Sequence, residues 1–478
     1  MGQWWEWLER CNEPIHRFIW GPVMLLLLVG TGLWFTLRSG FFQIRGWKLW
    51  WQKTLIDSLR QNRKKKKEKG EITPFQAMCT AMAGTVGTGN IAGVATAITM
   101  GGPGAVFWMG LSALLGTMTC FAENVLGSLY RWRDDQGRWH GGAMAYLERG
   151  SHCPMLARLY AVFCICSTLG MGNMVQANSI ASVAWEQWHI VPAASGYLMA
   201  ALAALVILGG IGAISRVTEK LVPTMAMIYL GGALCVVLAH ASQLPAVLRM
   251  VLREAFSLRA SMGGLAGYSV ASAIRLGVSR GVFSNEAGLG MSVLAHVASS
   301  EREPVVQGMW GIFQVVVDTL VVCGITALAV LTGSGYDPQQ YAAALESPAF
   351  DALPNGAQLT TQAFASVFGP FGGVIVGLSL MMFAFSTVLA SSYYGSMAVE
   401  YLAGKKAMLA YKILFICTLI MGSVMQLRLV WQLSDTFNGL MALPNLFGVL
   451  VLSPQVFRSL KDYLKRQKQE NSIYKTEK

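Results

Sequence analysis

The stretch from residue 83 to 93 reads AGTVGTGNIAG and places glycine, threonine and asparagine together inside a long apolar segment. Gly87 and Gly89 permit backbone angles that other residues avoid, and they let a ligand approach the main chain. If the helix unwinds here, the half that begins near Asn90 offers free N–H groups to a carboxylate. The half that ends near Thr85 offers free carbonyl oxygens to a hard cation such as Na⁺. The stretch therefore predicts adjacent sites for an anionic group and a cation.

A second polar interruption, VFSNEAGLG at residues 282–290, lies in another apolar segment. Peptide groups left unpaired within a membrane cost several kcal/mol each, so both interruptions must face a ligand, an ion or other protein. Matched glycine-interrupted segments in two halves of a chain are typical of a transporter's binding site. The alternative is that the glycines only allow close helix packing. That alternative does not explain why threonine, asparagine and glycine crowd together in two matched segments.

Charged side chains lie in or near the same apolar segments. Because a charge inside a membrane is costly to keep, each one is a functional hypothesis by default. Glu286, inside the second interruption, is a candidate for coupling or gating. Asp318, within FQVVVDTLVV, either pairs with Arg275 or Arg280 as an internal brace or couples to an ion. Arg280 is otherwise a candidate gate charge.

The elements that must position these residues are membrane helices. The chain has 478 residues, of which 54% are hydrophobic and only 13% charged, whereas soluble domains carry about 25% charged residues. Repeated apolar stretches of about 20 residues predict a polytopic all-α membrane protein, and the sequence lacks the alternating pattern of a β-barrel. Eleven spans are expected, at residues 16–37, 73–100, 103–130, 156–184, 195–213, 219–240, 268–298, 305–332, 364–395, 407–426 and 432–457.

Basic residues predict the orientation of these spans, because basic loops favour the cytoplasm. Lys64–Lys67, the loop 131–158 and the tail after Arg458 are basic, whereas the loop 333–360 has no lysine or arginine. An N-terminus outside and a C-terminus in the cytoplasm satisfy all four observations. Residues 241–266 do not fit this orientation, because they should lie outside but contain three arginines. We interpret them as an amphipathic helix on the outer surface. The lysine run indicates topology and contact with anionic lipid, so no nucleic-acid partner is expected.

The two interruptions divide the chain into two blocks of five spans. Because five is odd, the second block must enter the membrane from the opposite side, which makes an inverted repeat. The expected organisation is an extra N-terminal helix with a basic loop, a first repeat, an outer connector, a second repeat and a basic tail, at residues 1–72, 73–240, 241–266, 267–457 and 458–478.

Three segments resemble those of the alanine/glycine:cation symporters: TAMAGTVGTGNIAGVATAITMGGPGAVFWM, RGVFSNEAGLG and FAFSTVLASSYYG. The resemblance covers essentially the whole chain. It implies a leucine-transporter-like fold of five plus five helices, with discontinuous helices 2 and 7 and one extra N-terminal helix. It also implies symport of a small neutral amino acid with Na⁺, or less often H⁺, across a bacterial inner membrane. We expect a monomer without enzymatic activity and without a cofactor besides the coupling ion.

The resemblance also implies site residues. The amino acid would be bound by Thr85, Gly87, Thr88, Gly89, Asn90, Gln176, Phe283, Ser284 and Ser391. Gln176 would stand near the amino group, and Phe283 would line or gate the pocket. By analogy with the wider fold, one sodium ion would be held by carbonyls and hydroxyls of Ala83, Val86, Phe383, Ser386 and Thr387. Ligation by oxygen alone fits a hard monovalent cation.

The third segment departs from the family, which usually has Gly-Trp where this chain has Ala390-Ser391. Serine in place of tryptophan should enlarge and polarise the side-chain end of the pocket, so we expect tolerance for serine or glutamine besides alanine and glycine. An ion channel and an amino-acid sensor of the same fold stay open as alternatives. An intramembrane enzyme is disfavoured, because the candidate segments HGGAM and SNEAG lack the spacing of HExxH or GxSxG.

Overall fold

The computed structural model of the chain is helical almost throughout. It describes residues 2–58, 71–135, 137–256, 270–345, 347–425 and 428–476. Within these residues the only sheet is a two-stranded antiparallel hairpin, in which β1 (Trp132–Arg133) pairs with β2 (Trp139–His140). The lysine run at 64–67 and part of the expected outer connector, 257–266, lie outside the described residues.

The first part of the chain contains the N-terminal helices and the first break. Its helical segments are α1 (Gly2–Ile19), α2 (Pro22–Arg38), α3 (Phe42–Arg45), α4 (Trp47–Trp51), η1 (Gln52–Ile56), α6 (Pro74–Thr85), η2 (Gly89–Gly93), α7 (Val94–Gly101), α8 (Gly104–Leu129), α9 (Ala143–Ala145), η3 (Tyr146–Gly150), α10 (Pro154–Leu169), η4 (Gly170–Met174), α11 (Val175–Trp188), α12 (Pro192–Ile207) and α13 (Gly210–Ala239). The segments η1 to η4 are single turns of π-helix.

The second part contains the second break. Its helical segments are η5 (Ala241–Gln243), α14 (Leu244–Ala255), α15 (Val270–Asn285), α16 (Val293–Val297), α17 (Pro304–Val315), η7 (Val316–Cys323), α18 (Gly324–Gly333), α19 (Pro338–Ala344), η8 (Pro348–Ala352), α20 (Ala357–Phe368), α21 (Phe371–Val424), α22 (Arg428–Val451) and α23 (Ser453–Thr476). α21 consists of two helices that meet at Gly404, where the backbone is not helical.

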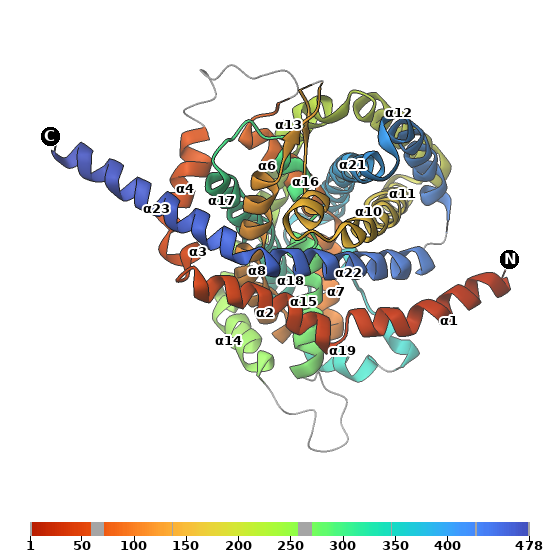
Figure 1. Ribbon diagram of the computed structural model, residues 1–478. Helices are drawn as coiled ribbons and strands as arrows, with labels where there is room; N and C mark the ends of the chain where they lie inside the picture. The colour runs from red at the N-terminus through yellow and green to blue at the C-terminus, as the bar shows by residue number, and fades with distance from the viewer. Residues whose placement is uncertain are drawn as a thin grey trace.

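Two groups of helices form the body of the molecule. α8 packs against α15 and α17, and α21 packs against α10, α11 and α12. Figure 1 shows α10, α11, α12 and α21 gathered on one side of the molecule. In the same view α1 and α23 extend away from the body in opposite directions. The two helix breaks and the residues that surround them lie within this body.

Glycines bring α8 close to its two neighbours. A Cβ added at Gly277 would lie 2.4 Å from the carbonyl oxygen of Ala105, and one at Gly308 would lie 2.7 Å from a methyl carbon of Val125. Small residues let membrane helices approach each other in this way. The packing explanation for glycine therefore applies at this interface, which is distinct from the two breaks.

Six of the described helices are long and apolar enough to cross a membrane, or seven if the bent pair Val430–Val451 and Ser453–Glu470 is one span. This number is below the eleven expected spans because several helices are too short for a crossing and one is long enough for two. The breaks shorten the helices on either side, and α12 has only 16 residues. α21 has 54 residues, more than twice the ~20 that one crossing needs. The eleven crossings and the inverted repeat stay predictions.

The predicted boundary between the fifth and sixth spans is wrong. The sequence predicts a loop between residues 213 and 219, but the chain turns at Leu208 and Gly209, and α13 then runs unbroken to Ala239. Polar residues of this stretch lie inside the helix, where the buried hydroxyl of Thr218 is 3.0 Å from that of Thr80 on α6.

The expected span 364–395 is divided into two elements. Gly369, with φ 54°, ends α20, and α21 begins two residues later at Phe371. A glycine in the left-handed region followed by proline stops a helix, because proline has no backbone N–H to continue it. The span that contains the third family-like segment therefore begins at Phe371.

The expected outer connector contains an amphipathic helix, α14. Val247 and Val251 are buried on one face, whereas Arg249 and Arg253 are exposed on another. The buried face packs against α8. The location of α14 on the outer surface stays a prediction.

Candidate functional site

The first break separates α6 from η2 and α7. α6 ends at Thr85, and Val86 has an extended backbone with ψ 94°. Asn90 bridges the gap, because its side-chain oxygen accepts a hydrogen bond from the N–H of Gly87 at 2.8 Å. η2 begins at Gly89, and the leading N–H groups of a helix have no acceptor within their own helix. The first break therefore presents peptide groups that are available to a ligand.

The second break lies between α15 and α16, at residues 286–292. Three of its residues have a left-handed backbone: Glu286 (φ 57°), Gly288 (φ 93°) and Gly290 (φ 72°). Glycine adopts this conformation readily, whereas it is uncommon for a glutamate. Such outliers persist only where the surrounding structure holds them, and they cluster at functional sites.

Side chains from α10 and α22 hold the carbonyls of the second break. Asn445 donates a hydrogen bond to the carbonyl of Gly288 at 2.9 Å, and the Tyr160 hydroxyl donates to that of Leu289 at 3.1 Å. The Asn445 amide also donates to the carboxylate of Glu123 at 2.5 Å. Unwound backbone within a membrane is tolerated only where protein or a polar cavity satisfies it. The scaffold thus fixes the path of the second break.

A cavity of about 30 Å³ lies between the two breaks. This volume corresponds to about two water-sized molecules, so the space is nearly closed. Its lining comes from both breaks and from α10, η4, α11, α21 and α22: Gly84, Thr85, Gly87, Thr88, Gly89, Ser167, Thr168, Met171, Gly172, Gln176, Phe283, Glu286, Leu289, Met291, Thr387, Ser391 and Asn438. The residues predicted to bind the amino acid line it, except Asn90 and Ser284.

Three polar atoms on the cavity wall have no hydrogen-bond partner among the described residues: Thr88 Oγ1, Gln176 Oε1 and Glu286 Oε2. All three residues are buried. Buried polar atoms are almost always paired, and an unpaired one costs about 1–3 kcal/mol. The amide nitrogen of Gln176 donates to the carbonyl of Met171 at 3.1 Å, which leaves the amide oxygen as an acceptor. The wall thus offers two acceptors, one of them a carboxylate, and a hydroxyl to a small polar molecule.

The residues predicted to hold sodium come together where α6 meets α21. The Ser386 hydroxyl lies 3.3 Å from the carbonyl oxygen of Ala83 and 2.8 Å from that of Phe383. The Thr387 hydroxyl lies 3.1 Å from the Phe383 oxygen, and a Cβ at Gly87 would be 2.9 Å from it. These carbonyl and hydroxyl oxygens suit a hard monovalent cation. Within the described residues no cluster of histidine, cysteine, aspartate and glutamate could hold a metal ion.

Asn90 and Ser284 belong to a buried cluster around Asp318. The Asn90 amide donates to one carboxylate oxygen of Asp318, and the Ser284 hydroxyl donates to the other, both at 2.8 Å. The brace predicted between Asp318 and Arg275 or Arg280 is therefore wrong. Neutral donors satisfy the carboxylate, and no arginine of the described chain lies within ion-pair distance of it. The physical reason is that η7 turns Asp318 towards the first break, whereas Arg275 is exposed on α15.

Arg280 lies beside the cavity rather than in its wall. Its guanidinium carbon is 5.5 Å from the centre of the Phe283 ring, which does line the cavity. A Cβ at Gly89 would be 3.2 Å from the same ring, so Phe283 bridges the two breaks. This arrangement places the candidate gate charge next to the aromatic wall, without contact to the space inside.

Sequence reasoning missed the part of the wall that α10 and η4 contribute. Ser167, Thr168, Met171 and Gly172 line the cavity, and a Cβ at Gly172 would lie 2.2 Å from the Ser391 hydroxyl. π-helical turns are frequent at functional sites, and η2, η4 and η7 all contribute residues to this region. The glycines of LGMGN within a predicted span were the available signal.

Comparison with known proteins decides the class to which this site belongs. The family model described as the sodium:alanine symporter family matches residues 5–477. The chain belongs to this family. It is 41% identical over 464 residues to the sodium/alanine symporter AgcS of Methanococcus maripaludis, with 96% of this chain and 98% of the relative covered. It is 33% identical over 462 residues to the probable sodium/glutamine symporter GlnT of Bacillus subtilis, with 96% and 92% covered.

A solved structure is also similar in fold. The manganese transporter of Eremococcus coleocola matches with a TM-score of 0.50 and 13% identity, over 81% of this chain and 78% of that one. At this identity the likeness concerns the fold alone. As a member of the sodium:alanine symporter family, the chain is a multi-pass membrane protein and a cation-coupled amino-acid symporter, not an enzyme. The family predicted from three sequence segments is thereby confirmed.

Proposed function

We propose that this symporter carries a small neutral amino acid into bacterial cells together with Na⁺ by alternating access. The observation that supports this most directly is the set of three unpaired polar atoms around the small cavity. Gln176 and Glu286 supply acceptor oxygens for an ammonium group. The Thr88 hydroxyl and the leading N–H groups of η2 supply donors for a carboxylate. The wall is therefore complementary to a zwitterion.

The cation would bind among Ala83, Val86, Phe383, Ser386 and Thr387. This set shares the first break with the amino-acid site, so an ion that orders the end of α6 also orders the peptide groups that follow it. Binding of the two ligands is then mutually favourable, and the linkage is reciprocal. One Na⁺ that moves down a membrane potential releases about 2.3 kcal/mol per 100 mV, enough for an amino-acid gradient of about fiftyfold.

H⁺ is the second candidate for the coupling ion. Glu286 and Asp318 are buried carboxylates, and among the described residues neither has a basic partner within ion-pair distance. An uncompensated carboxylate in a low-dielectric interior favours protonation or a nearby cation. We assign coupling roles to both carboxylates, and a gating role to Arg280 beside Phe283.

The substrate would have a small side chain. The cavity is small, which favours glycine, alanine and serine, and the relative AgcS is a sodium/alanine symporter. Ser391 provides a hydroxyl on the wall, and this favours serine. Glutamine is the larger candidate, because the relative GlnT is a probable sodium/glutamine symporter.

We further propose eleven membrane crossings in a five-plus-five inverted repeat, with one extra helix at the N-terminus. The N-terminus would lie outside and the C-terminus in the cytoplasm, as the basic loops indicate. The repeats would cover residues 73–240 and 267–457. The protein would act as a monomer in the bilayer, without nucleic acid.

Uptake by the purified protein in liposomes tests this function. Labelled L-alanine should accumulate only with an inward Na⁺ gradient, and unlabelled glycine and serine should compete with it. Accumulation that follows a pH gradient and ignores Na⁺ would select H⁺ as the coupling ion. Binding of L-alanine without any flux would favour a sensor, and ionic current without stoichiometric amino-acid transport would favour a channel.

Thr88→Val tests the proposed carboxylate site. It keeps the shape of the side chain and removes a hydroxyl that has no other partner, so the KM for L-alanine should rise about tenfold. The matched control is Thr96→Val on α7, where the hydroxyl already donates to the carbonyl of Ala92 at 2.9 Å. Equal KM values for the two variants would contradict the assignment of Thr88.

A further inference from the structure

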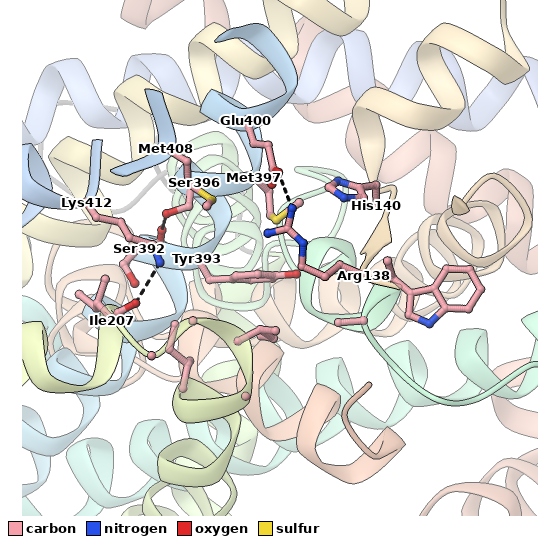
Figure 2. Close-up of a pocket in the computed structure, with 17 residues that line it drawn as sticks. Arg138, His140, Ile207, Ser392, Tyr393, Ser396, Met397, Glu400, Met408 and Lys412 are labelled. Atoms are coloured by element: carbon pink, nitrogen blue, oxygen red, sulfur yellow. Dashed lines mark hydrogen bonds and ion pairs between the residues drawn. The ribbon is translucent and has the colours of Figure 1, made fainter. Parts of the chain in front are cut away.

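A second and larger cavity, of about 230 Å³, shares a wall with the central site. The wall is α21, on which Ser391 lines the central cavity and the next residue, Ser392, lines the larger one. Figure 2 shows the larger cavity with the residues around it. They come from the β-hairpin, the end of α12 and the beginning of α13, the end of α16 and both helices of α21. All these segments lie at span ends that the basic-loop pattern predicts to be cytoplasmic.

Lys412 brings an incompletely compensated positive charge to this cavity. The side chain is half-buried, and its ammonium donates to the carbonyl oxygen of Ile207 at 3.1 Å (Figure 2). Within the described part of the chain no carboxylate lies within ion-pair distance of it. Charges away from bulk water are stabilised by an opposite charge. The cavity therefore has a place for an anionic group at Lys412.

Two buried hydroxyls offer acceptors to a cationic group. Ser392 donates its proton to the carbonyl of Leu389 at 2.7 Å, and Ser396 donates to the carbonyl of Ser392 at 2.6 Å. Because each hydroxyl proton is already used, only the oxygen lone pairs remain for a partner in the cavity. Both serines are buried in the cavity wall. Such oxygens suit an ammonium group, which only donates.

Apart from Arg138, His140 and Glu400, the rest of the lining suits a neutral side chain. Ile207, Met397 and Met408 contribute apolar surface, and Tyr393 lies across the cavity in Figure 2. The volume exceeds that of the central cavity several-fold. A small zwitterion with an uncharged side chain therefore matches the charge, the acceptors and the apolar surface of this space.

An ion-pair network extends from the cavity wall towards solvent. Glu400 accepts from Arg138 at 3.1 Å (Figure 2), and Asp134 accepts from Arg138 at 2.9 Å and from Lys405 at 3.1 Å. Exposure of the side chains rises from 8% at Glu400 to 35% at Arg138 and 48% at Lys405. Burial alone would raise the pKa of Asp134, but hydrogen bonds from Arg138, Lys405 and His140 hold it well below its usual range. The network thus stays ionised beside the cavity.

We propose that this cavity is a second binding site for the transported amino acid, with the carboxylate on Lys412 and the ammonium on the oxygens of Ser392 and Ser396. The site would receive the molecule after it leaves the central cavity on its way to the cytoplasm. The proposal rests on the proposed function, because both sites take the same zwitterion. A simple carboxylate ion is the competing occupant, since Lys412 alone would bind it.

Equilibrium binding of labelled L-alanine to the purified full-length protein in detergent, with Na⁺ present, tests the proposal. The wild type should bind two molecules per chain with different affinities. Lys412→Gln should lose one of them or weaken it at least tenfold, and Thr88→Val should weaken the other. Lys406→Gln is the matched control, because this lysine lies on the same helix, is exposed and does not line the cavity. Ser396→Leu places a larger side chain in the cavity, so it should weaken the same binding event as Lys412→Gln. It replaces Lys412→Gln in the test if that variant does not fold.

Three results would overturn the proposal in distinguishable ways. If the wild type and Lys412→Gln each bound one molecule with equal affinity, the second site would be disproved and the proposed function would be unaffected. No L-alanine bound by any variant removes both. Acetate that displaces the Lys412-dependent molecule as effectively as L-alanine does would mean a site for simple anions. L-Alaninamide, which lacks the carboxylate, should displace it at least tenfold less effectively than L-alanine.

Discussion

The two helix breaks that enclose the central cavity are built in different ways. The first is short, has no residue with positive φ, and is bridged by Asn90 from the next turn of its own chain. The second spans residues 286–292, has three residues with positive φ, and is tied to the scaffold by Asn445 and Tyr160. The first break therefore leaves peptide groups for ligands, whereas the peptide groups of the second are already used by the protein.

This difference suggests separate tasks for the two breaks. Peptide groups that no scaffold residue occupies can bind and release an ion or a carboxylate. Peptide groups that are anchored hold a strained residue in place, and here that residue is Glu286, which points an unpaired carboxylate oxygen at the cavity. Substitutions of the residues that anchor the second break should thus affect stability, whereas substitutions in the first break and of Glu286 should affect transport.

Asn445→Leu should have the largest effect. It leaves the carbonyl of Gly288, the carboxylate of Glu123 and the hydroxyl of Tyr146 without their partner, in a site where Asn445 is fully buried. At about 1–3 kcal/mol for each of the three groups, the expected loss of stability is roughly 3–9 kcal/mol. Thermal unfolding in detergent measures it. Gln455→Leu, on α23, removes an exposed hydrogen bond that the Tyr130 hydroxyl donates. This control should change the midpoint of thermal unfolding little.

Gly87→Ala should abolish most transport without a comparable loss of stability. The added Cβ would lie 2.9 Å from the Thr387 hydroxyl, a flexible group that can move but is a predicted cation ligand. Na⁺-driven uptake should fall about 100-fold, as expected when a binding group is displaced by about 1 Å. Gly93→Ala is the control, since nothing lies within 4 Å of its Cβ. If Gly87→Ala lowered stability as much as Asn445→Leu does, the proposal that the two breaks have separate tasks would be contradicted.

Glu286→Gln should weaken substrate binding about tenfold. The variant keeps the size of the side chain and removes the charge that would face the ammonium group, and a hydrogen bond to a charged group contributes about 1.5–3 kcal/mol. The KM for L-alanine in liposomes measures the change. Glu303→Gln removes a surface ion pair with Arg466 and should have no effect on KM. An unchanged KM for Glu286→Gln would mean that the second break contributes only shape.

Tyr160→Phe should have the smallest effect. It removes one hydrogen bond to the Leu289 carbonyl in the second break, so unfolding should be easier by about 1 kcal/mol. The KM for L-alanine should stay the same, because the hydroxyl does not line the cavity. Tyr130→Phe removes a comparable but exposed bond and should alter neither quantity. A changed KM without a change in stability would contradict a purely structural role for the Tyr160 hydrogen bond.

The positions of both breaks were predictable because glycine, threonine and asparagine disfavour a helix whatever surrounds them. The boundary near residue 213 was not, because polar residues in this stretch pack between two helices, as Thr218 does against Thr80. The partner of Asp318 was also not predictable. An isolated carboxylate in a span calls for compensation, but its identity, here Asn90 and Ser284, depends on how η7 turns beside the first break.

The sequence by itself determined that this chain crosses a membrane, where its helices are interrupted, and to which symporter family it belongs. These properties follow from composition, local backbone preference and long matching segments, none of which needs contacts between distant residues. Only the tertiary structure decided which polar atoms stay unpaired and face a common space. Whether a polar atom is paired depends on the packing of the whole chain. Asn445 on α22 donates to a carbonyl of the second break. Thr88, Gln176 and Glu286 line one cavity from three different elements, and each has a polar atom without a partner among the described residues.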